Sequence, residues 1–320
     1  MISSHQETHF GLPVFEFPRH GEEVPPELPD AGAVTWRISV ASYNNEEKWA
    51  EAFERFRAAV ELKRVTSLIV GAWEEPYETS PQGVIDALVG AREELGALRS
   101  LFLGEITGEE CEISWITQGT VTELLDAFPR LRDFTVRGGS SLAFPPVRHE
   151  ALVTLTIETG GLPREVVQGV AASDFPALEE LDLWLGTSEY GGDCEAADVA
   201  PILAGARLPA LRRLALCNSE IQNEIAAATA TAPVVAQLRD LDLSMGVLTD
   251  EGAAALLAGQ PLTHLASLDL SHNYLSDELR ERLRQELEPA GVALDVDADD
   301  AEEEDDEEDG GVWRYVAVSE

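Results

Sequence analysis

The sequence predicts an α/β solenoid in which a curved parallel sheet is backed by helices. A short leucine pattern recurs along most of the 320 residues. Within each copy, apolar and polar positions alternate as they do in a short strand. Amphipathic segments with helical spacing lie between the copies. Self-similarity at a period of this length is typical of a solenoid, because one strand and one helix cannot bury their apolar faces without neighbours.

The clearest copy, residues 265–275, reads LASLDLSHNYL and follows the pattern L-x-x-L-x-L-x-x-N-x-L. Equivalent units begin at Val65, Leu98, Leu131, Leu152, Leu178, Leu211 and Leu238. The first residues of successive units are 33, 33, 21, 26, 33, 27 and 27 residues apart. The fourth and sixth residues of each unit should face the core of a short strand, since alternate side chains share one face. The sequence therefore predicts eight stacked strands.

Two further strands and several helix starts extend this array. Alternating Trp36 and Ile38 predict a strand before the first unit, and Leu294 and Val296 predict one after the last. Thr249 is a suitable N-cap residue for a helix, since acids and good helix formers follow it. We thus expect ten strands between residues 33 and 297.

Residues 238–288 resemble the ribonuclease-inhibitor-like class of leucine-rich repeats. They contain two L-x-x-L-x-L units, and the helix starts T-D-E-G-A-A-A-L and L-S-D-E follow these units. The whole chain is similar to a family of repeat proteins common in actinobacteria. The resemblance covers most of 65–296 and implies a horseshoe-like binding scaffold. Gly160, Ser219 and Gly246 replace the asparagine of the motif, so those units are expected to turn differently.

Four segments follow from this pattern. We expect an N-terminal segment or cap at 1–32, a leucine-rich repeat solenoid at 33–297, an acidic disordered linker at 298–311 and a strand-like segment at 312–320. Neither a secretory signal nor an apolar run long enough to span a membrane is visible. The three cysteines are scattered, which fits a reducing bacterial cytoplasm.

The chain is strongly acidic, with 60 acids, 22 bases and a net charge of -38. Residues 297–309 hold 11 of the acids, so the rest of the chain keeps 49 acids and a net charge of 49 minus 22, or -27. Such a surface repels phosphate backbones and anionic membranes, which argues against nucleic-acid and membrane partners. A basic protein partner is favoured, although salt adaptation is another explanation for the acid excess.

The C-terminal segment 312–318 alternates aromatic and β-branched residues. An exposed strand of this kind tends to aggregate. We therefore expect it to fold back on an end of the solenoid, near the C-terminus, and to bury Trp313 there. Residues 12–17 have similar character and form the other loose end.

The repeat register predicts which side chains face outward. The third, fifth and seventh positions of each unit should project from the concave face. The residues expected to contact a partner there are Ile69, Phe102, Glu180, Asp182, Trp184, Asp240, Asp242 and Asp269. Tyr77 and Tyr190 join them from lengthened loops after the strands, where repeat proteins carry recognition residues. Asp242 and Asp269 have a second explanation, since aspartate at the fifth position is common in these repeats and can serve the fold instead of a partner.

No motif of metal, nucleotide or nucleophile chemistry stands out. Phosphate-binding loops, H-E-x-x-H and C-x-x-C are not present in the sequence. His5 and His9 lie in a segment expected to be loose and solvent-exposed. We therefore expect no cofactor and no metal. The leading hypothesis is a non-enzymatic scaffold that binds a basic, or mixed basic and apolar, protein. The alternatives are an enzyme or enzyme subunit that uses concave-face carboxylates, and a purely structural or salt-adapted protein.

Overall fold

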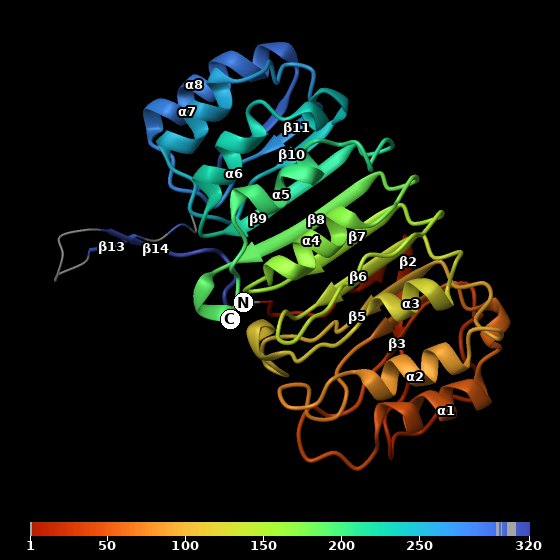
Figure 1. Ribbon diagram of the computed structural model, residues 1–320. Helices are drawn as coiled ribbons and strands as arrows, with labels where there is room; N and C mark the ends of the chain where they lie inside the picture. Colours follow the sequence, from red (N-terminus) through yellow and green to blue (C-terminus); the bar gives the residue numbers. More distant parts are fainter. Residues whose placement is uncertain (1, 299–300, 302, 306–311) are drawn as a thin grey trace. The chain divides into compact units, whose positions relative to one another are not determined.

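The computed structural model describes residues 2–298, 301, 303–305 and 312–320 (Figure 1). These residues form two compact units. The first unit comprises the described residues up to Glu158, together with 173–176 and 320. The second comprises 159–172 and the described residues from Ala177 to Ser319. In both units mostly parallel strands are backed by helices.

In the first unit, strands β2 to β7 pair in parallel in chain order, and β1 pairs antiparallel with β2. The strands are β1 (Thr8–His9), β2 (Leu12–Glu16), β3 (Thr35–Ile38), β4 (Ser67–Val70), β5 (Ser100–Leu103), β6 (Asp133–Arg137) and β7 (Thr154–Glu158). The helices are α1 (Trp49–Ala59), α2 (Gln82–Gly90) and α3 (Thr122–Ala127), with single 3-10 turns at Leu62–Arg64 and Ile113–Trp115. Helix α2 packs between α1 and α3, so the helices form one layer beside the strands (Figure 1).

The second unit repeats this arrangement. Strands β8 to β12 pair in parallel in chain order. They are β8 (Glu180–Gly186), β9 (Arg213–Ser219), β10 (Asp240–Asp242), β11 (Ser267–Asp269) and β12 (Ala293–Asp295). The helices are α4 (Arg164–Ala172), α5 (Ala196–Leu203), α6 (Gln222–Thr229), α7 (Asp250–Ala258) and α8 (Asp277–Leu287), with 3-10 turns at Ser188–Tyr190, Pro233–Gln237 and Glu288–Ala290. Each helix from α4 to α8 packs on the next.

The ten predicted strands are present, and their pairing follows the predicted register. Leu68 pairs with Leu101 in the first unit, and Leu241 pairs with Leu268 in the second. All four leucines are buried. The prediction of a mostly parallel α/β fold is therefore confirmed, and the strand and helix order is compatible with a solenoid. Among the described residues, no helix is long and apolar enough to cross a membrane.

The parallel sheet begins before the predicted boundary at residue 33. Residues 12–17, expected to be a loose end, include β2, which pairs in parallel with β3 so that Phe15 stands opposite Trp36. Phe17 is 2% exposed and packs edge-on against Phe56 of α1. The expectation is wrong because β2 pairs with β3 and the buried Phe17 side chain joins the core beside α1.

The C-terminal residues also differ from expectation. Of the predicted disordered linker 298–311, residues 299–300, 302 and 306–311 lie outside the described part of the chain. Residues Glu303–Asp305 form strand β13, which pairs antiparallel with β14 (Val312–Arg314), so the prediction of disorder is wrong for them. Trp313 is 58% exposed, so the prediction that it is buried is also wrong. The last residues fold back, but on the turns after β9 to β11 and not at the end of the array, as was expected. Val316 and Val318 are buried there.

Candidate interaction surfaces

Acidic side chains gather on the strands of the second unit at the positions that the register predicts. We call these residues the carboxylate strip: Glu180 and Asp182 on β8, Asp240 and Asp242 on β10, Asp269 on β11 and Asp295 on β12. The parallel pairing aligns Asp242 with Asp269, and Asp269 with Asp295, on neighbouring strands. The carboxylates come close together because neighbouring strands of a sheet are only about 4.8 Å apart. Residues from four strands thus form one negatively charged surface.

One cation, Arg213 of β9, lies within this strip. In register it stands between Glu180 on β8 and Asp240 on β10. Its Nη2 lies 3.0 Å from Oδ2 of Asp242 and 3.8 Å from Oδ2 of Asp182. The sequence register already placed Arg213 at an outward third position, but its pairing with the neighbouring carboxylates was missed. The guanidinium neutralises part of the strip and fixes the orientation of Asp242.

Asp242 and Asp269 also stabilise the turns of the repeats, which is the structural role expected for aspartate at the fifth position. Oδ1 of Asp242 accepts hydrogen bonds from the backbone N–H and the hydroxyl of Ser244, at 3.1 and 2.6 Å. Oδ1 of Asp269 accepts the same two bonds from Ser271, at 2.9 and 2.7 Å. A side-chain oxygen that accepts the N–H two residues further on stabilises the turn that ends the strand. One oxygen of each carboxylate therefore closes the repeat turn, and the acid at this position serves the fold itself.

The strip nevertheless keeps an uncompensated negative charge over a shallow hollow. The hollow has a volume of about 500 Å³ and is lined by polar and apolar residues of β9 to β12, among them Asp240, Asp269 and Asp295. Asp240 and Asp269 accept hydrogen bonds from serine hydroxyls, which carry no charge. Burial, together with the charges of Asp242 and Asp295, raises the pKa of Asp269 although the Ser271 bonds oppose the shift. A cationic ligand placed here would relieve this repulsion between carboxylates.

Ile69 and Phe102, predicted as apolar contacts on the open concave face, are not available to a partner. Both side chains are fully buried. Residues 2–9, which we call the N-terminal strap, run across the strands that carry them. Nε2 of His9 forms a hydrogen bond with the Ser100 hydroxyl at 2.8 Å. The centroid of the His9 ring lies 5.8 Å from that of the Phe102 ring. Arg137 covers the same phenyl ring from the next strand, at 5.1 Å. The prediction of exposed apolar residues here is wrong because the strap covers them.

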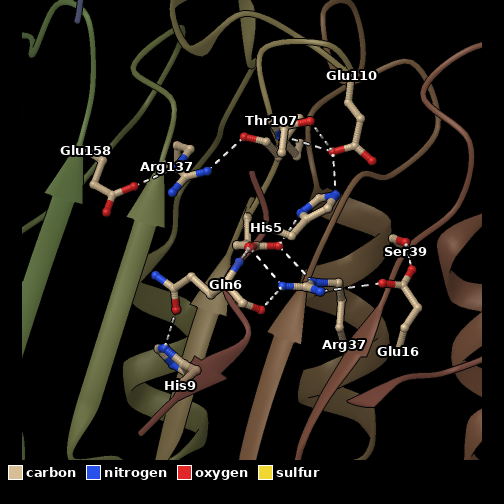
Figure 2. A network of polar contacts seen from close by, with 12 residues as sticks. His5, Gln6, His9, Glu16, Arg37, Ser39, Thr107, Glu110, Arg137 and Glu158 are labelled. Atoms are coloured by element: carbon tan, nitrogen blue, oxygen red, sulfur yellow. Dashed lines mark hydrogen bonds and ion pairs between the residues drawn. The ribbon is translucent and has the colours of Figure 1, made fainter. Parts of the chain in front are cut away.

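A buried ion pair holds the strap in place. Arg37 of β3 donates through Nε and Nη2 to the two carboxylate oxygens of Glu105, at 2.8 and 2.9 Å. The Arg37 side chain is 7% exposed and that of Glu105 is 1% exposed. Glu105 also accepts the backbone N–H of Gln6 at 2.7 Å, and Arg37 donates to the Gln6 carbonyl at 2.9 Å. Figure 2 shows Arg37, Gln6 and His5 converging on this point. Both backbone groups of one strap residue are thus bound by one buried pair.

His5 adds a titratable contact to the same network. Its Nδ1 lies 2.8 Å from Glu105 and its Nε2 lies 3.4 Å from Glu110 (Figure 2). Hydrogen bonds to Glu105 and Glu110 raise the pKa of His5 to about 9, so the ring is a cation near neutral pH. Burial alone would raise the pKa of Glu105, but the His5 hydrogen bond and the Arg37 charge outweigh it and hold this pKa below its ordinary value. The expectation that His5 and His9 are loose and exposed is wrong.

The stability that His5 contributes should be lost at alkaline pH. Because folding raises its pKa from 6.5 to about 9, the contribution is complete below pH 6.5 and disappears as the pH rises through 9. His5→Gln, which carries no charge at any pH, should destabilise the protein more at pH 6 than at pH 9.5. The difference should be on the order of 1 kcal/mol after solvent screening. Urea unfolding at both pH values measures it. His20→Gln, at an exposed histidine of the same unit, should leave the pH dependence as in the natural chain, and an identical pH dependence for both variants would contradict the assignment.

The remaining predicted contact residues are on other elements than the carboxylates of β10 and β11. Tyr77 belongs to the first unit, where its ring stacks on exposed Tyr43 with centroids 5.3 Å apart. Trp184 is on β8, two residues after Asp182, and is half-buried. Tyr190 ends the 3-10 turn after β8 and is also half-buried. The structure therefore brings the predicted acids of the second unit together, whereas Tyr77 belongs to the first unit and Trp184 and Tyr190 to the second.

The described residues can be compared with the requirements of a metal site and of a reactive thiol. They contain no group of three or more histidine, cysteine, aspartate or glutamate side chains suited to hold a metal ion. The three cysteines are free and buried. Burial raises the pKa of Cys111 to about 11 and that of Cys194 to about 12, so both thiols are protonated near neutral pH. A protonated, buried thiol is a poor nucleophile.

Comparison with known proteins places the chain in a family. No family model matches the chain, and no curated protein sequence does. Among solved structures, the chain is similar to a protein from Bacteroides fragilis whose crystal structure was determined by a structural genomics consortium. The two are 31% identical over 79% of this chain and 70% of the Bacteroides protein, with a TM-score of 0.72. The chain therefore belongs to the same family as this Bacteroides fragilis protein.

Proposed function

We propose that the chain is a non-enzymatic scaffold of the leucine-rich repeat type, and that it binds a basic or mixed basic and apolar segment of another protein on the carboxylate strip. The observation that carries the proposal is the alignment of acids across strands β10, β11 and β12 around a hollow that stays open to solvent. One further feature supports a binding role. Asp242 and Asp269 are held by serine and arginine partners, so the surface is preformed. Preformed sites bind with a smaller entropy cost.

The spacing of the strip suits an extended basic segment. Alternate strands of the sheet are about 9.6 Å apart and alternate residues of an extended chain are about 6.8 Å apart, a difference that the long side chains of lysine and arginine can span. A chain that crosses the strands could thus present a basic side chain to Asp182 on β8, then to Asp240 on β10 and Asp295 on β12. An apolar residue of such a segment would contact Leu294, which is half-buried and lines the same hollow. Long-range attraction to the strip should speed association and make it sensitive to salt.

Charge reversal at the strip tests this proposal. The variant Asp240→Lys/Asp295→Lys removes two carboxylates and leaves the turn-closing bonds of Asp242 and Asp269 intact. Binding of a synthetic 12-residue peptide of alternating arginine and leucine, followed by stopped-flow fluorescence at several salt concentrations, provides the measurement. We expect association to slow about tenfold or more and its salt dependence to flatten.

The matched control separates the strip from the overall charge of the chain. Glu251→Lys/Glu278→Lys makes the same change in net charge at exposed positions in the first turns of α7 and α8. This variant should bind the peptide nearly as fast as the natural chain. If both variants lose the same association rate, the peptide responds to net charge alone and the strip is not a binding site.

A further inference from the structure

Three turns at equivalent repeat positions form a row after strands β9, β10 and β11. Asn218, Met245 and His272 occupy the same place in successive repeats, 27 residues apart. All three have left-handed backbone conformations, with φ of 53, 66 and 49°. Such a conformation is uncommon for residues other than glycine and is often found at functional sites. We call the surface formed by Asn218, Met245 and Tyr274 the turn groove.

The C-terminal segment lies in the turn groove and is bound through its backbone. The Val318 N–H donates to Oδ1 of Asn218 at 2.9 Å, and Nδ2 of Asn218 donates to the Val318 carbonyl at 2.6 Å. The Ala317 N–H donates to the Met245 carbonyl at 2.9 Å. The Tyr274 hydroxyl accepts the Tyr315 N–H and donates to the Tyr315 carbonyl, both at 2.9 Å. Each turn of the row therefore binds one residue of the segment.

The side chain of Asn218 is built for this task. It is fully buried, and its Nδ2 also donates to the Thr159 carbonyl at 3.2 Å, which fixes the amide plane. A fixed amide that offers one donor and one acceptor to the same residue recognises an extended backbone whatever its side chains. With the segment in place the amide is buried and its donor and acceptor are both paired, so no buried polar group of this side chain is left without a partner.

The segment contributes few side chains to the contact. Val316 and Val318 are 6% and 8% exposed, whereas Trp313 and Tyr315 are 58% and 49% exposed. The guanidinium of Arg314 lies over the Tyr274 ring at 5.4 Å. The groove thus selects for two small apolar residues at alternate positions and one basic residue before them, the pattern Arg-x-Val-x-Val. Any extended segment with this pattern meets the same requirements.

We propose that the turn groove is a peptide-binding site that the chain fills with its own residues 314–318, and that an Arg-x-Val-x-Val segment of a partner protein displaces them. The attached segment acts as a competitor with an effective concentration in the millimolar range, as for flexible linkers. Release of the segment should therefore strengthen binding of an external peptide. This site lies on the turns after the strands and does not depend on the carboxylate strip.

Full-length variants and a labelled peptide test the proposal. Val316→Asp/Val318→Asp places charges where the segment is buried and should release it. The probe is a fluorescent peptide with the sequence of residues 312–320, and its binding is measured by fluorescence anisotropy. We expect the released variant to bind the probe at least tenfold more tightly than the natural chain does. A second probe with serine in place of Val312, Trp313, Tyr315 and Ala317 should bind within about threefold of the first, because the groove reads the backbone and the remaining side chains.

Substitution of Asn218 tests whether the probe binds in the turn groove. Asn218→Gly keeps the left-handed backbone but removes the amide, so in the released variant it should weaken probe binding about tenfold. The matched control is Asn44→Gly, at an exposed asparagine of the same backbone conformation in the first unit, which should have no effect. Equal binding with and without Asn218, or no binding to the released variant, overturns the proposal. Dimers of the natural chain that disappear in the released variant would also overturn it, since the occupant would then be a second copy of the chain.

Discussion

Glu105→Ala is expected to lower the free energy of unfolding by about 3–5 kcal/mol, the usual loss when one partner of a buried ion pair is removed. The Arg37 guanidinium would remain 7% exposed and without its two-point partner. The Gln6 N–H would lose its acceptor, and the strap would lose the contact that His5 makes to the same carboxylate. Chemical denaturation followed by tryptophan emission measures the loss.

Two comparisons make this prediction specific to the buried pair. Glu94→Ala removes a carboxylate from the exposed pair with Arg57 and should cost less than about 1 kcal/mol, because surface pairs are screened by solvent. The double variant Arg37→Met/Glu105→Ala should recover part of the loss, since no unpaired charge then remains buried. Equal destabilisation by Glu105→Ala and Glu94→Ala would show that the strap is not held by this pair. Trp36 and Trp49 are buried in the same unit, so emission follows its unfolding.

The strands could be predicted from sequence because each has a local signature. The L-x-L alternation places two side chains on one face, and the structure pairs such residues as Leu241 and Leu268 in register. Strand β2 was expected to have strand character, but its place in the sheet was missed because it has no leucine unit: Phe15 stands 21 residues before its partner Trp36, a spacing shorter than most others in the array. Its place is decided by aromatic packing around Phe56, and that packing appears only when the chain is folded.

The carboxylate strip could be predicted because strand register fixes the side of the sheet on which each residue lies.

The position of the N-terminal strap could not be predicted from the sequence. Residues 2–9 are mostly polar and have no periodicity, and their partners lie far along the chain: Gln6 meets Arg37, 31 positions later, and His5 meets Glu105, 100 positions later. Polar contacts of this range leave no pattern in the sequence. The same reason explains why Ile69 and Phe102 were expected to be exposed, since their register was predicted correctly but their cover was not.

The asparagine of the repeat motif has a structural role that the sequence only suggested. Asn273 is 1% exposed and connects two repeats. Its Oδ1 accepts the Leu248 N–H at 2.9 Å, and its Nδ2 donates to the carbonyls of Leu243 and Leu270 at 2.9 and 3.0 Å. In an earlier unit that lacks the asparagine, Gln222 donates to the Leu216 carbonyl at 2.8 Å. A side-chain amide thus closes both turns, although it comes from different positions.

Asn273→Ala is expected to lower the free energy of unfolding by about 3 kcal/mol. It leaves the Leu248 N–H and the Leu243 carbonyl buried without the partners that Asn273 provides, and each unpaired buried group costs about 1–3 kcal/mol. The control Gln285→Ala removes an exposed amide that bonds Glu281 on α8, and it should cost within about 0.5 kcal/mol. Urea unfolding of both variants, followed by circular dichroism, measures the difference. A loss below 1 kcal/mol for Asn273→Ala would mean that water replaces the amide and that the connection between repeats does not depend on it.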